Sequence, residues 1–494
     1  MDISQLPNID NLLVTADNPP RADLLGVGLD HARCAALHNY LVYYAWLAEG
    51  RLVASLHNNA NTFFTAHGAE AEALRPGLHP SLTAFLETAL LPPTYGTEVI
   101  PFFFWANQLS DPDNLIDDQM ADLSDQPPGS LVNLYLSNTG QGGEAGGGLF
   151  YHQGHHKVAV FMHMDDYDFA LPVEKHPELW HPLETVLSNW IEQIRVGKIT
   201  ASPAETPPVF VGEKVGNWEW MPYGEGQVES CLRAWEGLCE TVEARMPNGG
   251  NNVVTSNEVE HEPEPLLAPA ALDAALVLKP SFAHAFLSRA RRPRFRYIAP
   301  GLTLPPADVS TFAASQPFTR LLRDPSVVPP VRLFPSARPD LTVDLSGWSS
   351  PFHGNFRSMS ADSLAPSQIS VGVYSESIDR AALDSAEEGF RLVLPFGLQG
   401  PDGFEPSDAD PGARKSDGSG VKRGSCTDLF QHGYKPFGGD YYRPQRLERL
   451  LEHWTKMVER GVWMVGEDGV LGDIEMFRGA DGEGWRDYVI EPSW

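Results

Sequence analysis

A histidine and an aspartate two residues apart are the strongest candidates for chemistry in this sequence. His163 and Asp165 lie at the end of the apolar run 157–164, which predicts a strand, and the two-residue period of a strand directs both side chains to one face. An imidazole and a carboxylate on one face can bind a divalent metal ion and leave positions open for substrate. The sequence therefore predicts a mononuclear site for a metal such as iron, manganese or zinc.

A third ligand is expected from the short polar turn before this strand, which contains His152, His155 and His156. Any one of these imidazoles could face His163 across the turn. We take His156 as the candidate, with His152 and His155 as alternatives. The opposing interpretation is that a histidine-rich turn in a protein with 16 histidines is polar and exposed.

The pair formed by His163 and Asp165 resembles the first half of the facial triad in iron- and 2-oxoglutarate-dependent dioxygenases. His284, followed by Arg294, is similar to the distal histidine and the oxoglutarate-binding arginine of that family. The resemblance implies His284 as a metal ligand and Arg294 as a cofactor-binding residue. The sequence departs from the family pattern, because long helices follow Asp165 and because Arg296 stands where a serine is expected. We therefore do not assign the chain to this family.

Arg294 belongs to a strongly basic run, 288–297, that contains five arginines in ten residues. Guanidinium groups bind planar anions such as carboxylates and phosphates in a bidentate manner. This supports Arg294 as a ligand-binding candidate. The competing interpretation is that the run pairs with acidic side chains of the same chain, which are plentiful at a net charge of -29.

The elements that must position these residues are short apolar runs and longer amphipathic helices. Apolar residues at helical spacing predict helices over 30–49, 182–196 and 225–245, and a further one after Pro444. Short runs bounded by turn residues predict strands at 99–105, 131–136, 157–164, 294–299, 341–345, 369–374 and 390–395. We expect an α+β fold with mixed or antiparallel sheets and several long amphipathic helices, arranged in two packed units.

The clearest change of composition lies between residues 246 and 267, which are acidic and rich in proline. Such a segment is typical of a linker or a long exposed loop. We therefore expect an N-terminal α+β unit of residues 1–245, which contains the histidine-rich segment, and a C-terminal α+β unit of residues 268–494. The run 400–424, rich in Gly, Asp and Ser, is expected to be a mobile loop.

Composition narrows the class of protein. A net charge of -29 repels nucleic acid and anionic membranes. No run of about twenty apolar residues predicts a membrane-spanning helix, and the first residues do not resemble a secretory signal. Four cysteines in 494 residues do not suggest a disulfide scaffold, so we expect a reducing compartment, the cytoplasm.

These features predict a soluble intracellular enzyme, an oxidoreductase or a hydrolase, that acts on a small molecule with the help of a divalent metal. The G-x-S-x-G motif of many serine hydrolases does not occur. The alternative is a non-catalytic binding or assembly protein whose 12 tryptophans include partner surfaces. We expect Trp190 and Trp235 to be core residues, because each lies in the middle of an apolar helical stripe.

Overall fold

The chain folds into two compact units, each built from helices and small sheets. The computed structural model describes residues 3–21, 28–91, 100–116, 127–138, 147–161, 173–175, 177–210, 214–247, 264–321, 324–344, 352, 368–382, 385–401, 410–433 and 444–491. The described residues up to Met221 form the first unit, and those from Pro222 onward form the second. The fold is α+β, and the sheets are antiparallel except where β10 pairs with β20 in parallel.

The helices of the first unit are mostly short, apart from α2 and α10. The α-helices are α2 (His31–Ala48), α3 (Val53–Asn59), α4 (Phe63–His67), α5 (Ala69–Leu74), α6 (Pro80–Leu86), α7 (Pro112–Leu115) and α10 (Leu183–Arg195). Single 3-10 turns are η1 (Ile3–Gln5), η2 (Asp10–Leu12), η3 (Arg75–Gly77), η5 (Val173–Lys175) and η6 (Pro177–Leu179).

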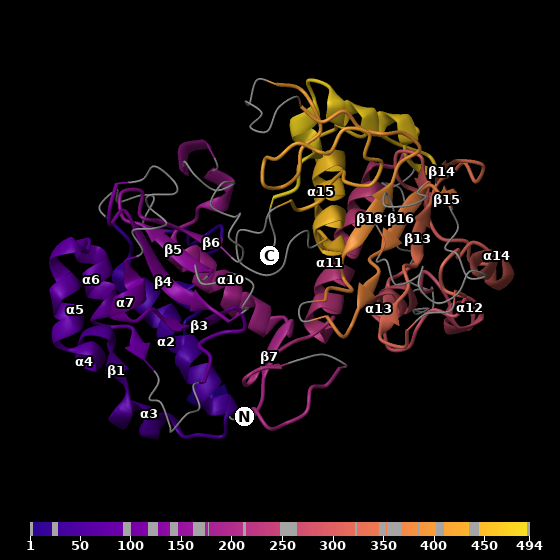
Figure 1. The fold of residues 1–494 in the computed structure, drawn as a ribbon. Coiled ribbons are helices and arrows are strands. Elements are labelled where there is room, and N and C mark those ends of the chain that lie inside the picture. The colour runs from indigo at the N-terminus through magenta and orange to yellow at the C-terminus, as the bar shows by residue number, and fades with distance from the viewer. Residues whose placement is uncertain are drawn as a thin grey trace, which may run out of the picture. The chain divides into compact units, whose positions relative to one another are not determined.

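An antiparallel sheet of four strands in sequence order is the centre of the first unit. Its strands are β3 (Ala106–Leu109), β4 (Leu131–Ser137), β5 (Gly148–His152) and β6 (Lys157–Phe161), and Figure 1 shows β4, β5 and β6 side by side. The remaining strands form two small sheets. One pairs β1 (Asn61–Thr62) with β2 (Leu90–Leu91), and the other has the order β7 (Ile199–Ala201), β9 (Trp218–Trp220) and β8 (Lys214–Val215).

Aromatic side chains fill the space between this sheet and the two long helices. The ring of Trp190, from α10, stacks on Phe103 with centroids 4.8 Å apart, and His38, from α2, stacks on Phe102 at 4.5 Å. On the other face of the sheet, Phe161 and Trp180 belong to a separate apolar cluster. The sheet is therefore covered on both faces, which agrees with the apolar character of its strands.

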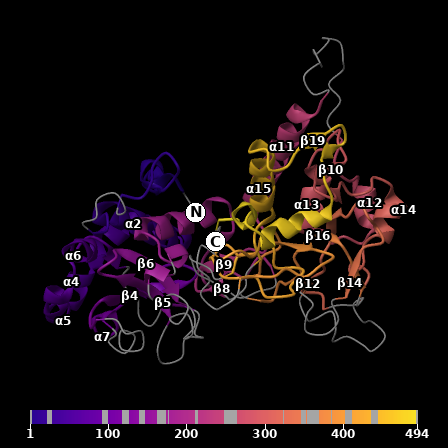
Figure 2. The ribbon, with the colours of Figure 1, turned by 90° about the horizontal axis from the view of Figure 1, so that it is seen from above.

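The second unit has two long helices that lie side by side, α11 (Glu225–Arg245) and α15 (Leu447–Glu459), as Figures 1 and 2 both show. Each turns an apolar stripe inward, so their mutual packing buries both stripes. Shorter helices are α12 (Pro269–Ala274), α13 (Phe282–Arg289), α14 (Val309–Ala314), η9 (Ile474–Asp481) and η10 (Trp485–Tyr488).

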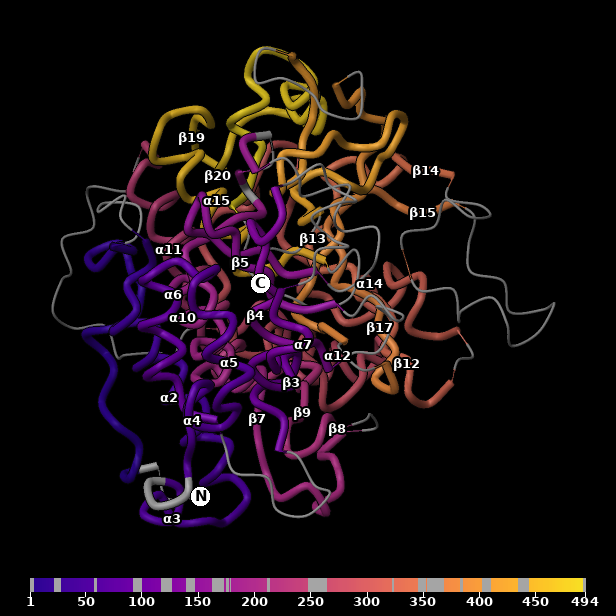
Figure 3. The backbone as a smooth tube through the Cα atoms, turned by 60° about the vertical axis from the view of Figure 1, so that its left-hand side comes forward, coloured from indigo at the N-terminus to yellow at the C-terminus, as the bar shows by residue number. Residues whose placement is uncertain are grey.

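Small sheets complete the second unit. The three-stranded antiparallel sheet has the order β13 (Arg332–Pro335), β16 (Gly372–Ser375) and β18 (Phe390–Val393). The pair β14 (Thr342–Asp344) and β15 (Gln368–Ser370) is visible at the edge of Figure 3. The others are β10 (Tyr297–Ala299), β11 (Leu302–Thr303), β12 (Val327–Val328), β17 (Ile378–Asp379), β19 (Val465–Gly466) and β20 (Gly469–Val470).

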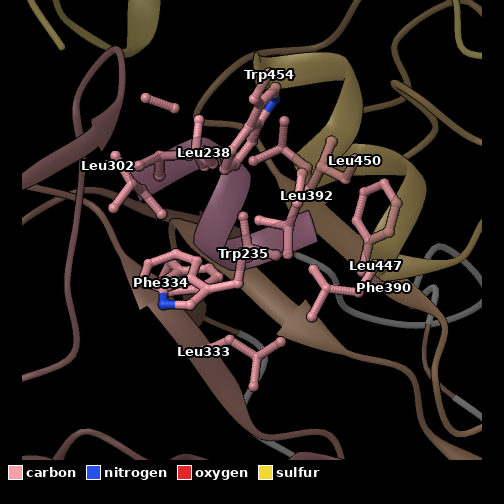
Figure 4. Close-up of a cluster of buried hydrophobic side chains, with 14 of the residues drawn as sticks. Trp235, Leu238, Leu302, Leu333, Phe334, Phe390, Leu392, Leu447, Leu450 and Trp454 are labelled. Carbon is pink, nitrogen blue, oxygen red and sulfur yellow. The ribbon is translucent and has the colours of Figure 1, made fainter. Parts of the chain in front are cut away.

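The core of the second unit lies between the two long helices and one face of the three-stranded sheet. Figure 4 shows Trp235 of α11 against Phe334 of β13, with rings stacked at 5.4 Å. The indole N–H of Trp235 donates to the carbonyl of Arg291 at 2.9 Å. Trp190 and Trp235 are 1% and 0% exposed, which confirms that both are core residues.

Three expectations from the sequence differ from the structure. The division between the units lies at Met221 and Pro222, so α11 belongs to the second unit, where its apolar stripe packs on α15, and not to an N-terminal unit ending at residue 245. The buried run 102–105 forms bends and not a strand, because the N–H of Phe103 bonds the nearby carbonyl of Ala106. Residues 412–421 of the expected mobile loop 400–424 are also well packed, with Arg414 and Ser416 buried. Most of the segment 246–267 lies outside the described residues.

In the parts of the chain that the structure describes, no helix is both long and apolar enough to span a membrane.

Candidate histidine site

The predicted metal ligands fall in different parts of the molecule. His156 lies in the turn between β5 and β6 of the first unit, whereas His284 and Arg294 belong to the second unit. His163 and Asp165 lie outside the described residues. Within the described ranges, the structure contains no group of three or more His, Cys, Asp or Glu side chains that could hold a metal ion.

His156 ends the turn in a backbone conformation that side chains seldom adopt. Its φ of 55° is in the left-handed region, where non-glycine residues are uncommon, although histidine is among the residues enriched there. The N–H of His156 closes the turn on the carbonyl of His152 at 2.8 Å. Backbone strain of this kind concentrates at functional sites, so it supports His156 as a candidate functional residue.

Two hydroxyl groups connect the imidazoles of His156 and His79 in one polar array. Nδ1 of His156 is 3.0 Å from the hydroxyl of Tyr151, and Nδ1 of His79 is 2.8 Å from Oγ of Ser81. The hydroxyls of Tyr151 and Ser81 are themselves hydrogen-bonded. The two rings meet with their centroids 4.5 Å apart. We call His79, Ser81, Tyr151 and His156 the histidine array.

The start of α2 covers the middle of the array. The N–H of Leu29 donates to Oγ of Ser81 at 3.2 Å. Gly28 has a φ of 123°, and a Cβ atom added to it would lie 2.8 Å from Cβ of Ser81 and 2.9 Å from Cε1 of His79. Because the backbone of Gly28 lies directly over the serine, Ser81 is placed to relay a proton and not to attack a substrate.

Gln153 holds the turn against the segment that carries His79. Its side-chain amide donates to the carbonyls of Gly77 and Gly129, at 3.0 and 2.6 Å, and its carbonyl oxygen accepts the N–H of His79 at 2.6 Å. The bonds to Gly77 and His79 tie the start of α6 to the β5–β6 turn, and the bond to Gly129 ties the turn to the segment before β4. The array therefore depends on residues more than seventy positions apart in the chain.

The other two histidines of the turn stabilise its shape. Nδ1 of His152 accepts the N–H groups of Gly154 and His155, at 3.1 and 3.3 Å. Burial and then the neighbouring His155 imidazole lower the pKa of His152 to about 4. Nε2 of His155 lies 3.0 Å from a carboxylate oxygen of Glu174. Both side chains thus have structural partners within the turn and its surroundings.

Hydrogen bonding also decides which imidazole nitrogens have lone pairs. Nδ1 of His79 accepts the N–H of Ser81 at 3.3 Å, so the neutral ring carries its proton on Nε2 and presents a donor there. His152 has the same tautomer for the same reason. His156 differs, because its Nδ1 contacts a hydroxyl that can either donate or accept. Of these rings, His156 is therefore the one suited to act as a base or as a metal ligand through Nε2.

The electrostatic surroundings keep His156 neutral. Partial burial, together with the nearby imidazoles of His79 and His155, lowers its pKa below the ordinary 6.5. Burial raises the pKa of Tyr151, so its phenol is protonated at neutral pH. At pH 7 the phenol of Tyr151 and the imidazole of His156 are thus both uncharged.

The candidates in the second unit have different surroundings. His284 lies on α13, and its Nε2 is buried with no hydrogen-bond partner within the described structure. Arg294 is exposed, and its N–H donates to Glu243. Three neighbouring arginines of the basic run have partners within the chain. Arg289 and Arg291 form ion pairs with glutamates of α11, and Arg292 donates hydrogen bonds to two backbone carbonyls.

Three members of the array, His79, Ser81 and Tyr151, were not singled out from the sequence. His79 and Ser81 flank the first residue of a short helix, where they cap its start, and Tyr151 reads as one apolar residue of a strand. Nothing in their spacing relates them to His156, apart from the short separation of Tyr151. The array exists only because the hairpin and the start of α6 meet.

Comparisons with known proteins give no relative for this chain: no family model matches it, and neither a curated protein nor a solved structure is significantly similar to it.

Proposed function

We propose that the protein is an enzyme that acts on a small molecule at the histidine array, with His156 as its acid–base group. The supporting observation is the contact between the Tyr151 hydroxyl and Nδ1 of His156, which orients the ring in a strained turn. A neutral imidazole held in this way can accept a proton through Nε2. Tyr151 and Ser81 would then pass protons toward His79.

A divalent metal is the second part of the proposal. His163 and Asp165 follow β6, the strand that begins directly after His156, so they are close to the array along the chain. They would supply an imidazole and a carboxylate, ligands that suit iron, manganese or zinc, and Nε2 of His156 would stay free as the acid–base group. The metal would activate water or bind an oxygen atom of the substrate, which suits a hydrolase or an oxidoreductase.

The cysteines and the net charge bear on the compartment and on the class of substrate of the proposed enzyme. All four cysteines are free thiols, three of them buried, as expected for a protein of a reducing compartment such as the cytoplasm. The net charge of -29 disfavours nucleic acid as the substrate. The ten tryptophans that the structure describes are all buried, so they give no support to a partner surface made of exposed indoles.

Elemental analysis of the purified protein tests the metal. We expect up to one equivalent of iron, manganese or zinc in the wild-type protein, and loss of that metal in His163→Gln and Asp165→Asn. The matched control is His31→Gln, which changes an exposed histidine of the same unit. A wild-type protein free of metal after purification without chelators would contradict this part of the proposal.

Acid–base function is tested separately by turnover. The wild-type protein is incubated with ester and phosphate-ester substrates and with a small-molecule extract, and consumption is followed by mass spectrometry. His156→Gln should lower the rate by a factor of about 10² or more, while His31→Gln should not change it. If no compound is consumed, or if His156→Gln matches the wild-type rate, the enzyme proposal fails.

A further inference from the structure

Arg332 is a buried cation that has no counterion among the described residues. The residue is 7% exposed, and its Nε is shielded from solvent. In the part of the chain that the structure describes, its Nε has no hydrogen-bond partner and its side chain forms no ion pair. Buried charges are normally paired, because removal of an isolated ion from water is strongly unfavourable. Since no described residue neutralises Arg332, the site can accept an anion from outside the chain.

The sheet fixes the position of Arg332. Its N–H and carbonyl are bonded by the side chain of Gln316, at 2.8 and 3.3 Å. In the register of β13 and β16, Arg332 lies opposite Tyr374. Its Nε passes over Gly372, where an added Cβ atom would lie only 3.3 Å away. The backbone is thus held rigidly, and the glycine leaves space for the side chain.

The neighbouring polar groups are already occupied. Tyr374 donates its hydroxyl to the carbonyl of Ser370 at 2.8 Å, and burial raises its pKa, so it remains a neutral phenol. On the next strand, Arg391 lies opposite Tyr374 and bonds Glu376 at 2.6 Å. Arg391 therefore has its own carboxylate.

The same face of the sheet carries an aromatic cluster. Tyr374 packs with Phe318 and Phe352, with ring centroids 5.0 to 6.0 Å apart. Val393 and Ile369 belong to the same buried group. An anion that reaches Arg332 would therefore have its charged end on a guanidinium and its body near apolar rings.

We propose that Arg332 binds the carboxylate of a small aromatic or apolar monocarboxylic acid. Two oxygens of a carboxylate match two N–H groups of a guanidinium, and one negative charge neutralises one positive charge. A phosphate dianion would leave a net charge among apolar side chains, so it fits less well. This site lies in the second unit and is independent of the histidine array.

The experiment measures thermal unfolding of the full chain with benzoate, benzyl alcohol or inorganic phosphate at equal ionic strength. At a benzoate concentration about ten times Kd, linkage predicts that the second unit unfolds about 3 to 5 °C higher. Benzyl alcohol, which has the ring but not the charge, should cause no shift. A shift with phosphate but not with benzoate would overturn the choice of a carboxylate.

Substitutions test whether benzoate binds at Arg332. Arg332→Met should abolish the benzoate shift, and Arg338→Met, which changes an arginine whose side chain is 63% exposed in the same unit, should retain it. Arg332→Lys keeps the charge but not the planar pair of donors, and should reduce the shift if Arg332→Met does not fold. Equal shifts in the wild-type protein and in the Arg332 variant that folds would show that benzoate binds elsewhere, and the proposal would be wrong.

Discussion

Nδ1 of His38 lies 2.8 Å from the hydroxyl of Tyr135 in the core of the first unit, and both side chains are fully buried. Nε2 of the same ring faces the carbonyl of Leu90 at 2.9 Å. A carbonyl only accepts hydrogen bonds, so Nε2 carries the proton and Nδ1 accepts from the tyrosine. The buried polar groups are thus satisfied with His38 in its neutral form.

The first prediction is that acid destabilises the first unit through His38. Burial lowers its pKa to about 4, whereas the unfolded chain has the ordinary 6.5. Between these values the unfolded state binds more protons, so stability is complete above pH 6.5 and is lost as the pH falls toward 4. The full loss is about 3 kcal/mol, of which about 2 kcal/mol occurs by pH 5.

Urea unfolding at pH 7.5 and pH 5 measures this loss. His38→Gln should be less stable at both pH values but should lose about 2 kcal/mol less between them. His152, whose pKa is also about 4, contributes in the same direction and remains in both proteins. An identical loss in the wild-type protein and in His38→Gln would contradict the assignment.

The second prediction concerns the tryptophans of the two cores. Trp190→Ala and Trp235→Ala should each reduce the free energy of unfolding of their own unit by about 3 to 5 kcal/mol, because each leaves a large cavity. Trp235→Phe should cost less, since it keeps a ring against Phe334. Circular dichroism and fluorescence during urea unfolding follow both units. Wild-type stability in either alanine variant would show that the residue is not a core residue.

The third prediction uses two glycines with positive φ. Gly50, at φ 74°, has no atom within 4 Å of an added Cβ, so Gly50→Ala should cost only the strain of a left-handed alanine, about 1 to 2 kcal/mol. Gly28→Ala adds a collision with Ser81 and His79, and should cost more and disturb the histidine array. Thermal unfolding compares the two variants. Equal losses would mean that the start of α2 does not press on the array.

The fourth prediction is the order of proteolytic cleavage. The acidic, proline-rich sequence 246–267 should be cut first. Residues 412–421 should resist cleavage despite their content of Gly, Asp and Ser, because Arg414, Ser416 and Val421 are buried. Mass spectrometry of the first fragments identifies the sites. An initial cut within 412–421 or within α10 would contradict this organisation.

The sequence by itself determined the elements with strong local patterns. The apolar stripes of residues 182–196 and 225–245 predicted the bounds of α10 and α11 closely, because helical periodicity depends only on residues three or four positions apart. The fold class followed from the same patterns. The burial of Trp190 and Trp235 was predicted from these patterns as well, because a tryptophan in an apolar stripe faces the core.

Tertiary structure decided which elements pack together. The composition change at 246–267 suggested a division of the chain after α11, but the stripe of that helix packs on α15, more than two hundred residues later. Likewise, residues 412–421 have the composition of a loop, and only their hydrogen bonds to other segments, such as those of Ser416 with Gln431 and Gln445, hold them against the rest of the unit.

The candidate sites are also a product of tertiary structure. His79 and Ser81 meet Tyr151 and His156 through bonds between segments that are far apart in sequence, and residue spacing contains no information about such contacts. Arg332 looks like any surface arginine until the register of β13 places it over a buried face. Local sequence fixes helices and strands, because their interactions are local; the environment of a polar side chain depends on which distant residues surround it.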